Sequence, residues 1–456
     1  MAWGRDHLWM QDRRAGDLQS NGRYTIIAKA EGCYLYDIHG NRLIDGNSSG
    51  FVKAIGHRWP EIADAIADQL TTLAFTPISH GCATIPAIRL ARKIADLSPG
   101  SLSRCFFCGG GGEAVEVAIQ LARQYQYLSG KTQKTKIVSR RPEYHGSTYA
   151  TISLGSHADR NNAIFEPLMP GVFQVDAPHC YKCPWGHKDR SPSDCCMLSV
   201  ASLRNLIAAE GAETIAAFIA TPFRVGGSLP NPDYWPQVRQ ICNEAGIVLI
   251  ADEVTLAFGR AGTWFGMERF GVVPDIMVIG KGLTSGELPV GGLVATKEIA
   301  DAFDQAKDGL GNFYHGVTFG SHAAVMAAGL KNLEIIEREG LVENSNRMGS
   351  YFYERVTARL LDRHPIVGAV FGGMGLILSI ALVKNRRTRQ AYPGGADGPF
   401  LSRLNELVRS NGLFLNMRHT TNIAPPLIAT KQILDDIVDI LDHSFSQIER
   451  EFPPED

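Results

Sequence analysis

Two charged side chains follow two apolar runs of the sequence. Asp252 closes a run that begins at Val248, and Lys281 follows a second run that begins at Ile276. Apolar runs of this length are typical of strands buried on both faces of a parallel sheet. Open α/β sheets bind ligands at the carboxyl ends of their strands. An acid and an amine at two strand ends therefore predict a clamp for a cofactor.

Lys281 is the candidate for covalent chemistry. A surface lysine is the commoner interpretation, but Lys281 follows a fully apolar run and precedes residues 282–286, Gly-Leu-Thr-Ser-Gly, which let a ligand approach the backbone closely. Burial would lower the pKa of the amine and favour Schiff-base chemistry. Asp252 is either a turn residue or the counter-ion of a buried cation, such as the pyridinium nitrogen of pyridoxal phosphate.

A run of four glycines, residues 109–112, separates an expected strand from an expected helix. Glycine runs mostly mark turns, but backbone N–H groups at the positive end of a helix can also bind a phosphate. Tyr144 and His145 follow another expected strand by a few residues. The tyrosine ring could belong to the core or could stack on a planar cofactor.

Strands and helices alternate from about residue 85, which favours a mainly parallel sheet with helices on both faces. The expected strands are 105–107, 136–139, 217–220, 248–252, 276–280 and 292–295, and the expected helices are 87–97, 113–128 and 235–245.

The length of the chain, 456 residues, exceeds what one hydrophobic core usually holds, so we expect two domains. Residues 1–60 and 330–456 should form one small domain built from both ends, and residues 61–329 should form the large domain. A hairpin turning at His39-Gly40 and a helix capped by Thr430 are expected in the small domain.

The composition excludes several classes of function. Hydrophobic residues make up 45% of the chain and charged residues 20%, with a formal net charge of −2. Without a long basic run, neither nucleic acid nor an anionic membrane is the expected partner. Residues 1–6 lack the apolar core of a signal peptide, and no apolar stretch reaches the roughly 18 residues of a membrane span. We expect a small-molecule partner and a cytoplasmic location.

The nine cysteines are an odd number, which fits free thiols in a reducing compartment. Cys180 and Cys183 have zinc-like spacing, and His187, Cys195 and Cys196 follow them. A structural zinc is the alternative; we favour buried free thiols and expect no metal.

Together these residues resemble the class III aminotransferases of fold type I, the pyridoxal-phosphate enzymes typified by omega-amino acid:pyruvate transaminases. The matching blocks, in the expected order, are 251–254 with 258–260, 281–286 with 288–289, 315–319 and 425–428. Several ordered blocks are more specific than any single motif. The resemblance implies an α/β fold: a large domain with a mainly parallel seven-stranded sheet, plus a small α+β domain from both termini.

By this resemblance, Lys281 forms an internal aldimine with pyridoxal 5'-phosphate, and Asp252 pairs with the pyridine nitrogen. The implied reaction is a ping-pong transfer of an amino group from an amine or omega-amino acid to a keto acid, aldehyde or ketone. The residues implied to bind the cofactor are Gly110, Gly111, Gly112, Tyr144, His145, Asp252, Val254, Lys281 and Thr318. Thr318 would act from the neighbouring subunit, which implies a homodimer, or a tetramer, with active sites at the interface.

The sequence departs from the family pattern in the phosphate loop. Gly110 and Gly112 stand where the family usually has the serines of Ser-Gly-Ser. Each missing hydroxyl could cost about 1.5–3 kcal/mol of phosphate binding. The phosphate must then rely on main-chain N–H groups and Thr318.

Further departures concern the substrate side. Thr221 stands in place of the usual glutamate before proline, Thr255 in place of glutamine or isoleucine, and Gly372 in place of arginine. Lys281 and Asp252 are unaffected. A decarboxylase, racemase or lyase on the same scaffold is therefore the alternative function, and a non-catalytic protein is a second one.

Three residues are predicted to bind the substrate. Val52 falls where relatives often place a pocket aromatic, and Tyr149 is expected to line the same pocket. Arg418 could bind a carboxylate through its bidentate guanidinium. Its spacing to Pro425 is shorter than in the family, so a surface arginine is an equal alternative.

Overall fold

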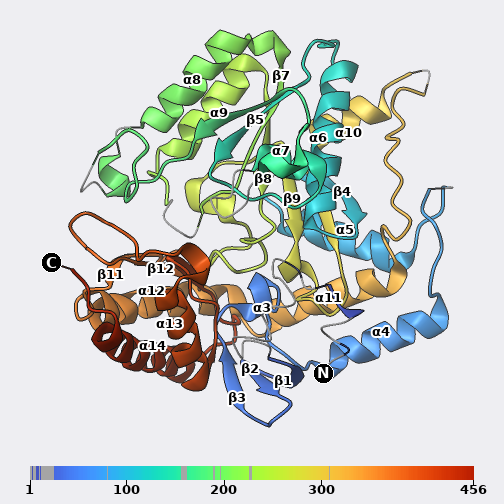
Figure 1. Ribbon diagram of the computed structural model, residues 1–456. Coiled ribbons are helices and arrows are strands. Elements are labelled where there is room, and N and C mark those ends of the chain that lie inside the picture. Colours follow the sequence, from blue (N-terminus) through green and yellow to red (C-terminus); the bar gives the residue numbers. More distant parts are fainter. Residues whose placement is uncertain are drawn as a thin grey trace.

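The computed structural model describes most of the chain. The described residues are 3, 7–9, 11, 25–79, 81–155, 162–187, 191–195, 197–224, 229–307 and 309–455. Figure 1 shows a layered α/β unit in its upper half and the C-terminal helices with two smaller sheets below it.

A seven-stranded sheet forms the centre of the large α/β unit. In spatial order its strands are β4 (Leu102–Cys108), β10 (Gly291–Thr296), β9 (Ile276–Gly280), β8 (Val248–Asp252), β7 (Ile215–Ala220), β5 (Lys136–Arg141) and β6 (Val172–Asp176). β10 is antiparallel to both neighbours, and the other pairings are parallel. The predicted mainly parallel sheet is confirmed.

Helices cover both faces of this sheet, which explains why its central strands are apolar along their whole length. In β8, Val248 and Ile250 pack towards α6, whereas Leu249 and Ala251 pack towards the opposite face. The helices around the sheet are α5 (Ile85–Leu97), α6 (Gly111–Leu128), α7 (Tyr149–Leu154), α8 (Leu198–Glu210), α9 (Tyr234–Ala245), α10 (Lys297–Asp304) and α11 (Ala323–Arg338).

The two ends of the chain meet in a four-stranded sheet. Its strands are β1 (Ile27–Glu31), β2 (Tyr34–Asp37), β3 (Arg42–Asp45) and β13 (Leu413–Phe414). The C-terminal β13 runs parallel to the N-terminal β3, with Leu413 beside Ile44. The predicted hairpin turn at His39-Gly40 connects β2 to β3.

A three-stranded antiparallel sheet and three long helices complete the C-terminal part. The strands are β11 (Val367–Phe371), β12 (Leu378–Leu382) and β14 (Thr420–Ile423), and the helices are α12 (Leu341–Val356), α13 (Pro399–Ser410) and α14 (Lys431–Glu451). Thr430 caps α14, because its side chain accepts a hydrogen bond from the N–H of Ile433. Shorter helices are α3 (Ser48–Phe51) and α4 (Pro60–Thr72).

Single turns of 3₁₀ or π helix connect these elements. They cover Asn162–Phe165, Pro192–Asp194, Ala212–Thr214, Gly266–Phe270, Lys281–Leu283, Thr357–Leu361 and Gly395–Asp397. Among the described residues, no helix combines the length and the apolar character needed to cross a bilayer.

Two further side chains mark the limits of the core. Leu70 is 46% exposed, because α4 buries only Ile62. Within the loop that connects β12 to α13, Tyr392 is buried and stacks on Phe400 with ring centroids 3.6 Å apart. That loop is therefore partly anchored in the core of the C-terminal part.

Candidate active site

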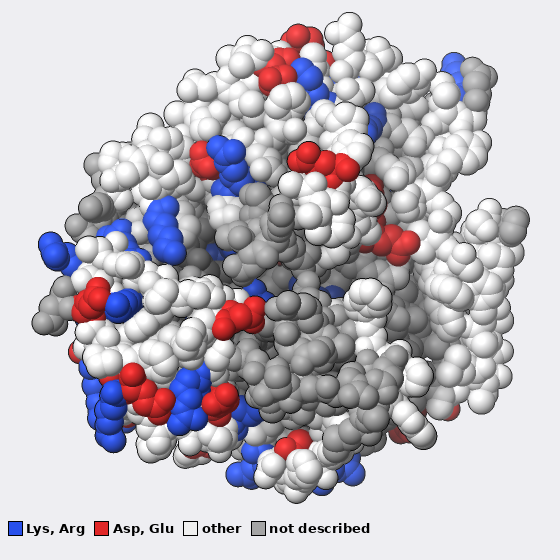
Figure 2. Space-filling view, in the orientation of Figure 1, with Lys and Arg blue, Asp and Glu red and all other residues white. Residues whose placement is uncertain are grey.

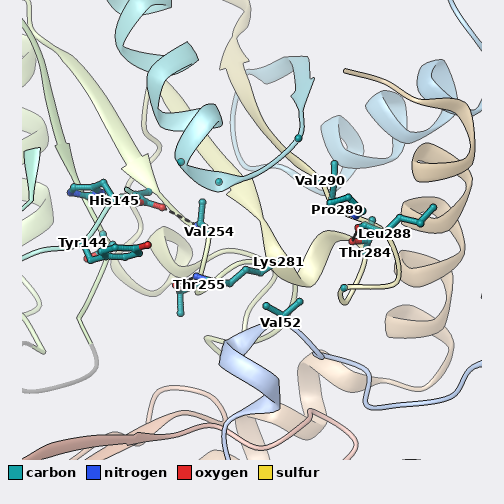
Figure 3. A pocket seen from close by; sticks show the side chains of 17 residues that line it. Val52, Tyr144, His145, Val254, Thr255, Lys281, Thr284, Leu288, Pro289 and Val290 are labelled. Carbon is teal, nitrogen blue, oxygen red and sulfur yellow. Dashed lines mark hydrogen bonds and ion pairs between the residues drawn. The ribbon is translucent and has the colours of Figure 1, made fainter. Parts of the chain in front are cut away.

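A cavity of about 330 Å³ opens where the central strands of the seven-stranded sheet end. Lys281 and Asp252 both line it, as do Val52 from the N-terminal part and Val254 from the loop after β8. Figure 3 shows Val52 facing Lys281 across the cavity. Segments that are distant in the sequence therefore form one site.

Lys281 begins a 3₁₀ turn immediately after β9. Its φ of 39° lies in the left-handed region, which is strained for a residue with a side chain and is common at functional sites. The Nζ atom donates a hydrogen bond of 3.0 Å to Oγ1 of Thr255. Burial lowers the pKa of Lys281, and the charge of Asp252 opposes this shift. The predicted desolvated amine is thus present at the strand end.

Asp252 ends β8, on the strand adjacent to β9. Its Oδ1 accepts a hydrogen bond of 3.1 Å from the N–H of Val254, and its Oδ2 lies 2.7 Å from Nδ1 of His145. Asp252 is 4% exposed. The carboxylate is therefore held by two partners other than Lys281.

His145 connects Asp252 to a second buried acid. Its Nε2 atom lies 3.3 Å from Oε2 of Glu143. Burial by itself would lower the pKa of His145, but the hydrogen bond with Asp252 and the contact with Glu143 outweigh it and raise the pKa to about 9. The imidazole is therefore a cation near neutral pH.

Helix α6 directs its N-terminus at the cavity. The helix begins at Gly111, and its capping residue Gly110 supplies no side-chain hydrogen bond. Gly111 and Gly112 line the cavity. A Cβ atom on Gly111 would come within 2.8 Å of Val254. A Cβ atom on Gly112 would meet its nearest neighbour, Cα of Gly146, at 3.6 Å, which is an ordinary contact. This glycine-lined helix N-terminus suits an anion such as a phosphate.

Two more predicted residues reach the site through their side chains. Tyr144 lines the cavity and is 46% exposed, and its hydroxyl lies 3.3 Å from Oγ of Ser147. Val254 lies against Gly111. An aromatic ring and an aliphatic side chain are thus available to contact a planar group.

Four predicted residues do not line the cavity. Gly110 lies directly before the two glycines that do, and Tyr149 is 62% exposed at the first position of α7. Thr318 is exposed in the segment between α10 and α11, and Arg418 lies between β13 and β14. Within one described chain, these side chains are outside the site.

Several lining residues were not predicted. Thr221, Thr255, Thr284 and Gly286 all line the cavity. Thr221 and Thr255 were noted only as departures from a family pattern. Their placement at the ends of β7 and β8 is the feature that could have identified them.

The cysteine-rich segment forms no metal cluster among the residues that the structure describes. Cys183 and Cys195 carry free thiols, and Cys196 lies outside the described residues. Tyr181, between Cys180 and Cys183, packs edge-on against Phe371 of β11 with ring centroids 5.6 Å apart. The segment therefore contacts the C-terminal part of the protein.

Comparison with known proteins identifies the family. A family model described as aminotransferase class-III matches residues 18–445. The chain is 36% identical over 441 residues to a probable aminotransferase of Mycobacterium tuberculosis, covering 95% of this chain and 92% of that protein. It is 35% identical over 416 residues to a putrescine–pyruvate aminotransferase of Pseudomonas aeruginosa, covering 91% and 88%.

A solved structure gives the same result. The PLP-bound amine transaminase of an uncultivated Pseudomonas species is 32% identical and superposes with a TM-score of 0.90, covering 97% of this chain and 99% of that chain. The fold is therefore that of the fold type I enzymes, and the cofactor is pyridoxal phosphate. With a family match that spans nearly the whole chain, this protein belongs to the class III aminotransferases.

Proposed function

We propose that this enzyme transfers an amino group from an amine or omega-amino acid to a keto acid, with Lys281 as the covalent residue. The observation that carries the proposal is the placement of Lys281 and Asp252 at the ends of adjacent strands, facing one cavity with separate hydrogen-bond partners. This arrangement suits a planar ring that is bonded at one end and paired with a carboxylate at the other.

The residues present fit the cofactor. Bound pyridoxal phosphate supplies a carbonyl carbon and a ring that accepts electrons. Asp252 would hold the ring nitrogen, and the N-terminus of α6 at Gly111 and Gly112 would hold the phosphate, with Gly110 as its cap. Tyr144 and Val254 would contact the ring.

Lys281 is suited to move a proton as well as to bind. Burial lowers the pKa of its amine, which makes the amine a better match for proton exchange with a substrate. The hydroxyl of Thr255 accepts a hydrogen bond from Nζ and so keeps the amine in the cavity. Lys281 would therefore act as general base and acid at the substrate carbon.

The lining of the cavity supports an amine donor with an apolar body. Val52 and the segment Leu288, Pro289 and Val290 contribute apolar surface. Among the described lining residues there is no arginine that could hold a donor carboxylate with two parallel hydrogen bonds. A relative is a putrescine–pyruvate aminotransferase, which supports a diamine as the first donor to test. Tyr149 and Arg418 stay predicted substrate contacts.

We propose a homodimer that completes the site. Phe75, Ile85, Ile88, Tyr314 and Phe319 are 42%, 66%, 59%, 85% and 68% exposed, which is unusual for large apolar side chains. The rings of Phe75 and Phe319 lie 6.1 Å apart, so part of this surface is continuous. Figure 2 shows few charged side chains on the side of the molecule where α4 lies.

Thr318 directly precedes Phe319 and would reach the cofactor phosphate of the second copy. Sedimentation of the purified enzyme should therefore give the mass of a dimer.

We also propose a division into a small domain of residues 1–60 and 330–456 and a large domain of residues 61–329. The pairing of β13 with β3 supports it. The free thiols of the buried Cys33, Cys108 and Cys242 support a cytoplasmic location.

A half reaction tests the proposed activity. The enzyme loaded with cofactor is mixed with putrescine or an omega-amino acid, without a keto acid. We expect one equivalent of carbonyl product and pyridoxamine phosphate, and a later addition of pyruvate should yield alanine and the original spectrum. If no pyridoxamine phosphate forms on addition of the amine, the result would instead favour a decarboxylase, racemase or lyase on the same scaffold.

A further inference from the structure

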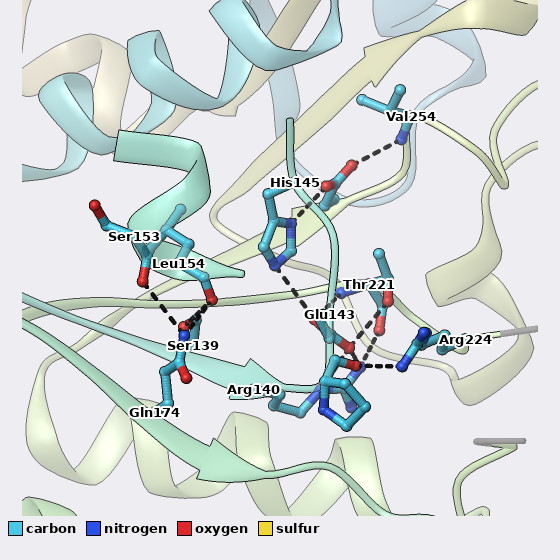
Figure 4. Close-up of polar contacts among 12 residues, drawn as sticks. Ser139, Arg140, Glu143, His145, Ser153, Leu154, Gln174, Thr221, Arg224 and Val254 are labelled. Carbon is cyan, nitrogen blue, oxygen red and sulfur yellow. Dashed lines mark hydrogen bonds and ion pairs between the residues drawn. The ribbon is translucent and has the colours of Figure 1, made fainter. Parts of the chain in front are cut away.

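A chain of four charged side chains lies behind the cavity. The guanidinium of Arg140 forms an ion pair with Glu143, Glu143 contacts His145, and His145 contacts Asp252 (Figure 4). The Nε atom of Arg140 donates to Oε1 of Glu143 at 3.0 Å. Only Asp252 and His145, at the end of this chain, line the cavity.

All four side chains are buried. Arg140, Glu143, His145 and Asp252 are 0%, 1%, 4% and 4% exposed. The negative charges of Glu143 and Asp252 are balanced by Arg140 only if His145 is protonated as well. An unbalanced buried charge would destabilise the fold. Burial would raise the pKa of Glu143, but Arg140 and His145 lower it to about 2. Glu143 is therefore the permanent anion that opposes the His145 cation.

The charged groups that act on His145 come from two elements. Asp252 faces it from β8, and Glu143 faces it from the segment after β5. Arg140 reaches His145 only through Glu143. The guanidinium of Arg224 donates to the carbonyl of Pro142 at 2.7 Å, which helps to fix the segment that carries Glu143.

Thr221, directly after β7, donates two hydrogen bonds to the carboxylate of Glu143. Its N–H donates to Oε2 at 3.2 Å, and its hydroxyl donates to Oε1 at 3.1 Å. Arg140 also donates to the carbonyl of Thr221 at 2.5 Å. Position 221 is where the family pattern usually has glutamate. In this chain the carboxylate at this place comes from Glu143, and the residue at 221 is a small hydroxyl donor.

We propose that Glu143, held by Arg140, is a positioning residue that keeps His145 protonated and Asp252 aimed at the cofactor ring, and that it replaces a carboxylate from position 221. This inference rests on the proposed role of Asp252. Glu143 touches neither substrate nor cofactor; it acts through His145. A protonated His145 in turn keeps Asp252 ionised and fixes the orientation of its carboxylate.

A cycle of three variants tests the replacement. In Glu143→Gln the His145 cation loses its anion. In Thr221→Glu a second carboxylate is forced against Glu143. The double variant combines Glu143→Gln with Thr221→Glu, so that one carboxylate is present again, this time from position 221 after β7. The measurements are the titration midpoint of His145, by NMR of histidine-labelled enzyme with His145→Asn as the assignment standard, and the dissociation constant of pyridoxal phosphate.

We expect the His145 midpoint to fall below its native value of about 9 in Glu143→Gln, because one of the two acids that raise it is lost. Both single variants should bind the cofactor at least tenfold more weakly, and the double variant should return to within about threefold of the native value. Glu210→Gln is the matched control. Glu210 forms an ion pair of 2.9 Å with Lys136, which lies at the other end of β5 from Glu143. It should leave the His145 midpoint unchanged.

Two results would overturn the proposal: an unchanged His145 midpoint in Glu143→Gln, or a double variant as weak as the weaker single variant. The titration of His145 needs no catalysis. An enzyme that shows the predicted shifts but transfers no amino group would therefore refute the proposed function and leave the role of Glu143 standing.

Discussion

Lys281 and Asp252 end neighbouring strands and line one cavity, but they do not pair with each other. Among the ion pairs of the described residues, Asp252 pairs with His145, while the amine of Lys281 donates to Thr255 at 3.0 Å. Each group is therefore free to act on a different end of a molecule placed between them. A direct salt bridge would have indicated a structural pair instead.

The phosphate loop should tolerate new side chains at one glycine and reject them at its neighbour. A serine at Gly111 would place Cβ 2.8 Å from Val254, whereas Gly112 has ordinary contact distances. We expect Gly111→Ser to weaken binding of pyridoxal phosphate at least tenfold, because the overpacked side chain costs about 1–3 kcal/mol and must displace Val254 or the loop. Gly112→Ser should bind it equally well or more tightly, because it adds a hydroxyl donor. Equilibrium titration of the apoenzyme measures both; equal losses would refute this account of the loop.

Thr255 should matter for the chemical step more than for stability. Thr255→Val keeps the shape of the side chain and removes the acceptor of the Lys281 hydrogen bond. We expect a decrease of about tenfold in the single-turnover rate, because the hydrogen bond that positions the amine is lost. Thr255→Ser retains the hydroxyl and should recover most of the rate. A native rate in Thr255→Val would show that this hydrogen bond does not position the amine.

The stability of the apoenzyme should fall at alkaline pH. The pKa of His145 is raised to about 9 in the folded chain, against about 6.5 when unfolded. Its proton therefore stabilises the fold fully below pH 6.5, and this contribution is lost as the pH rises to 9. The expected loss is on the order of 3 kcal/mol. Urea unfolding between pH 6 and 10 measures it, and His145→Asn should remove most of this slope.

Val52 should set the size of the donor that the site accepts. A Cβ atom on Gly286 would lie 2.6 Å from Cγ1 of Val52, so there is no space on that side. A larger side chain at position 52 must extend into the cavity. Val52→Phe should lower kcat/KM for bulky amines at least tenfold, which corresponds to about 1.4 kcal/mol of activation free energy. The decrease for small amines should be much smaller. An equal decrease for both sizes would show that Val52 does not limit the donor.

The sequence alone predicted the groups that are local to one strand. Asp252 and Lys281 could be found because each comes at the end of an apolar run. In the structure every residue of these two strands is buried. The antiparallel direction of β10 could not be found, because an apolar run does not encode direction. Thr430 as a helix cap was found from a local pattern, as expected for capping.

The groups missed by the sequence act over long separations. Glu143 and Thr221 are 78 residues apart, and only the pairing of β5 with β7 brings them together. Tyr149, which stays a predicted substrate contact, is 62% exposed at the first position of α7 in the single chain. The proposed role of Thr318 depends on a second copy of the chain, which a pattern within one sequence does not place.

The attachment of the cofactor to Lys281 tests the central claim most directly. Enzyme loaded with pyridoxal phosphate is reduced with borohydride, digested and analysed by mass spectrometry, in parallel with Lys281→Ala. We predict that the reduced cofactor is found on Lys281, and that the variant loses the adduct, the visible absorbance and the transaminase activity. An adduct on another lysine, or an active Lys281→Ala enzyme, would contradict the account.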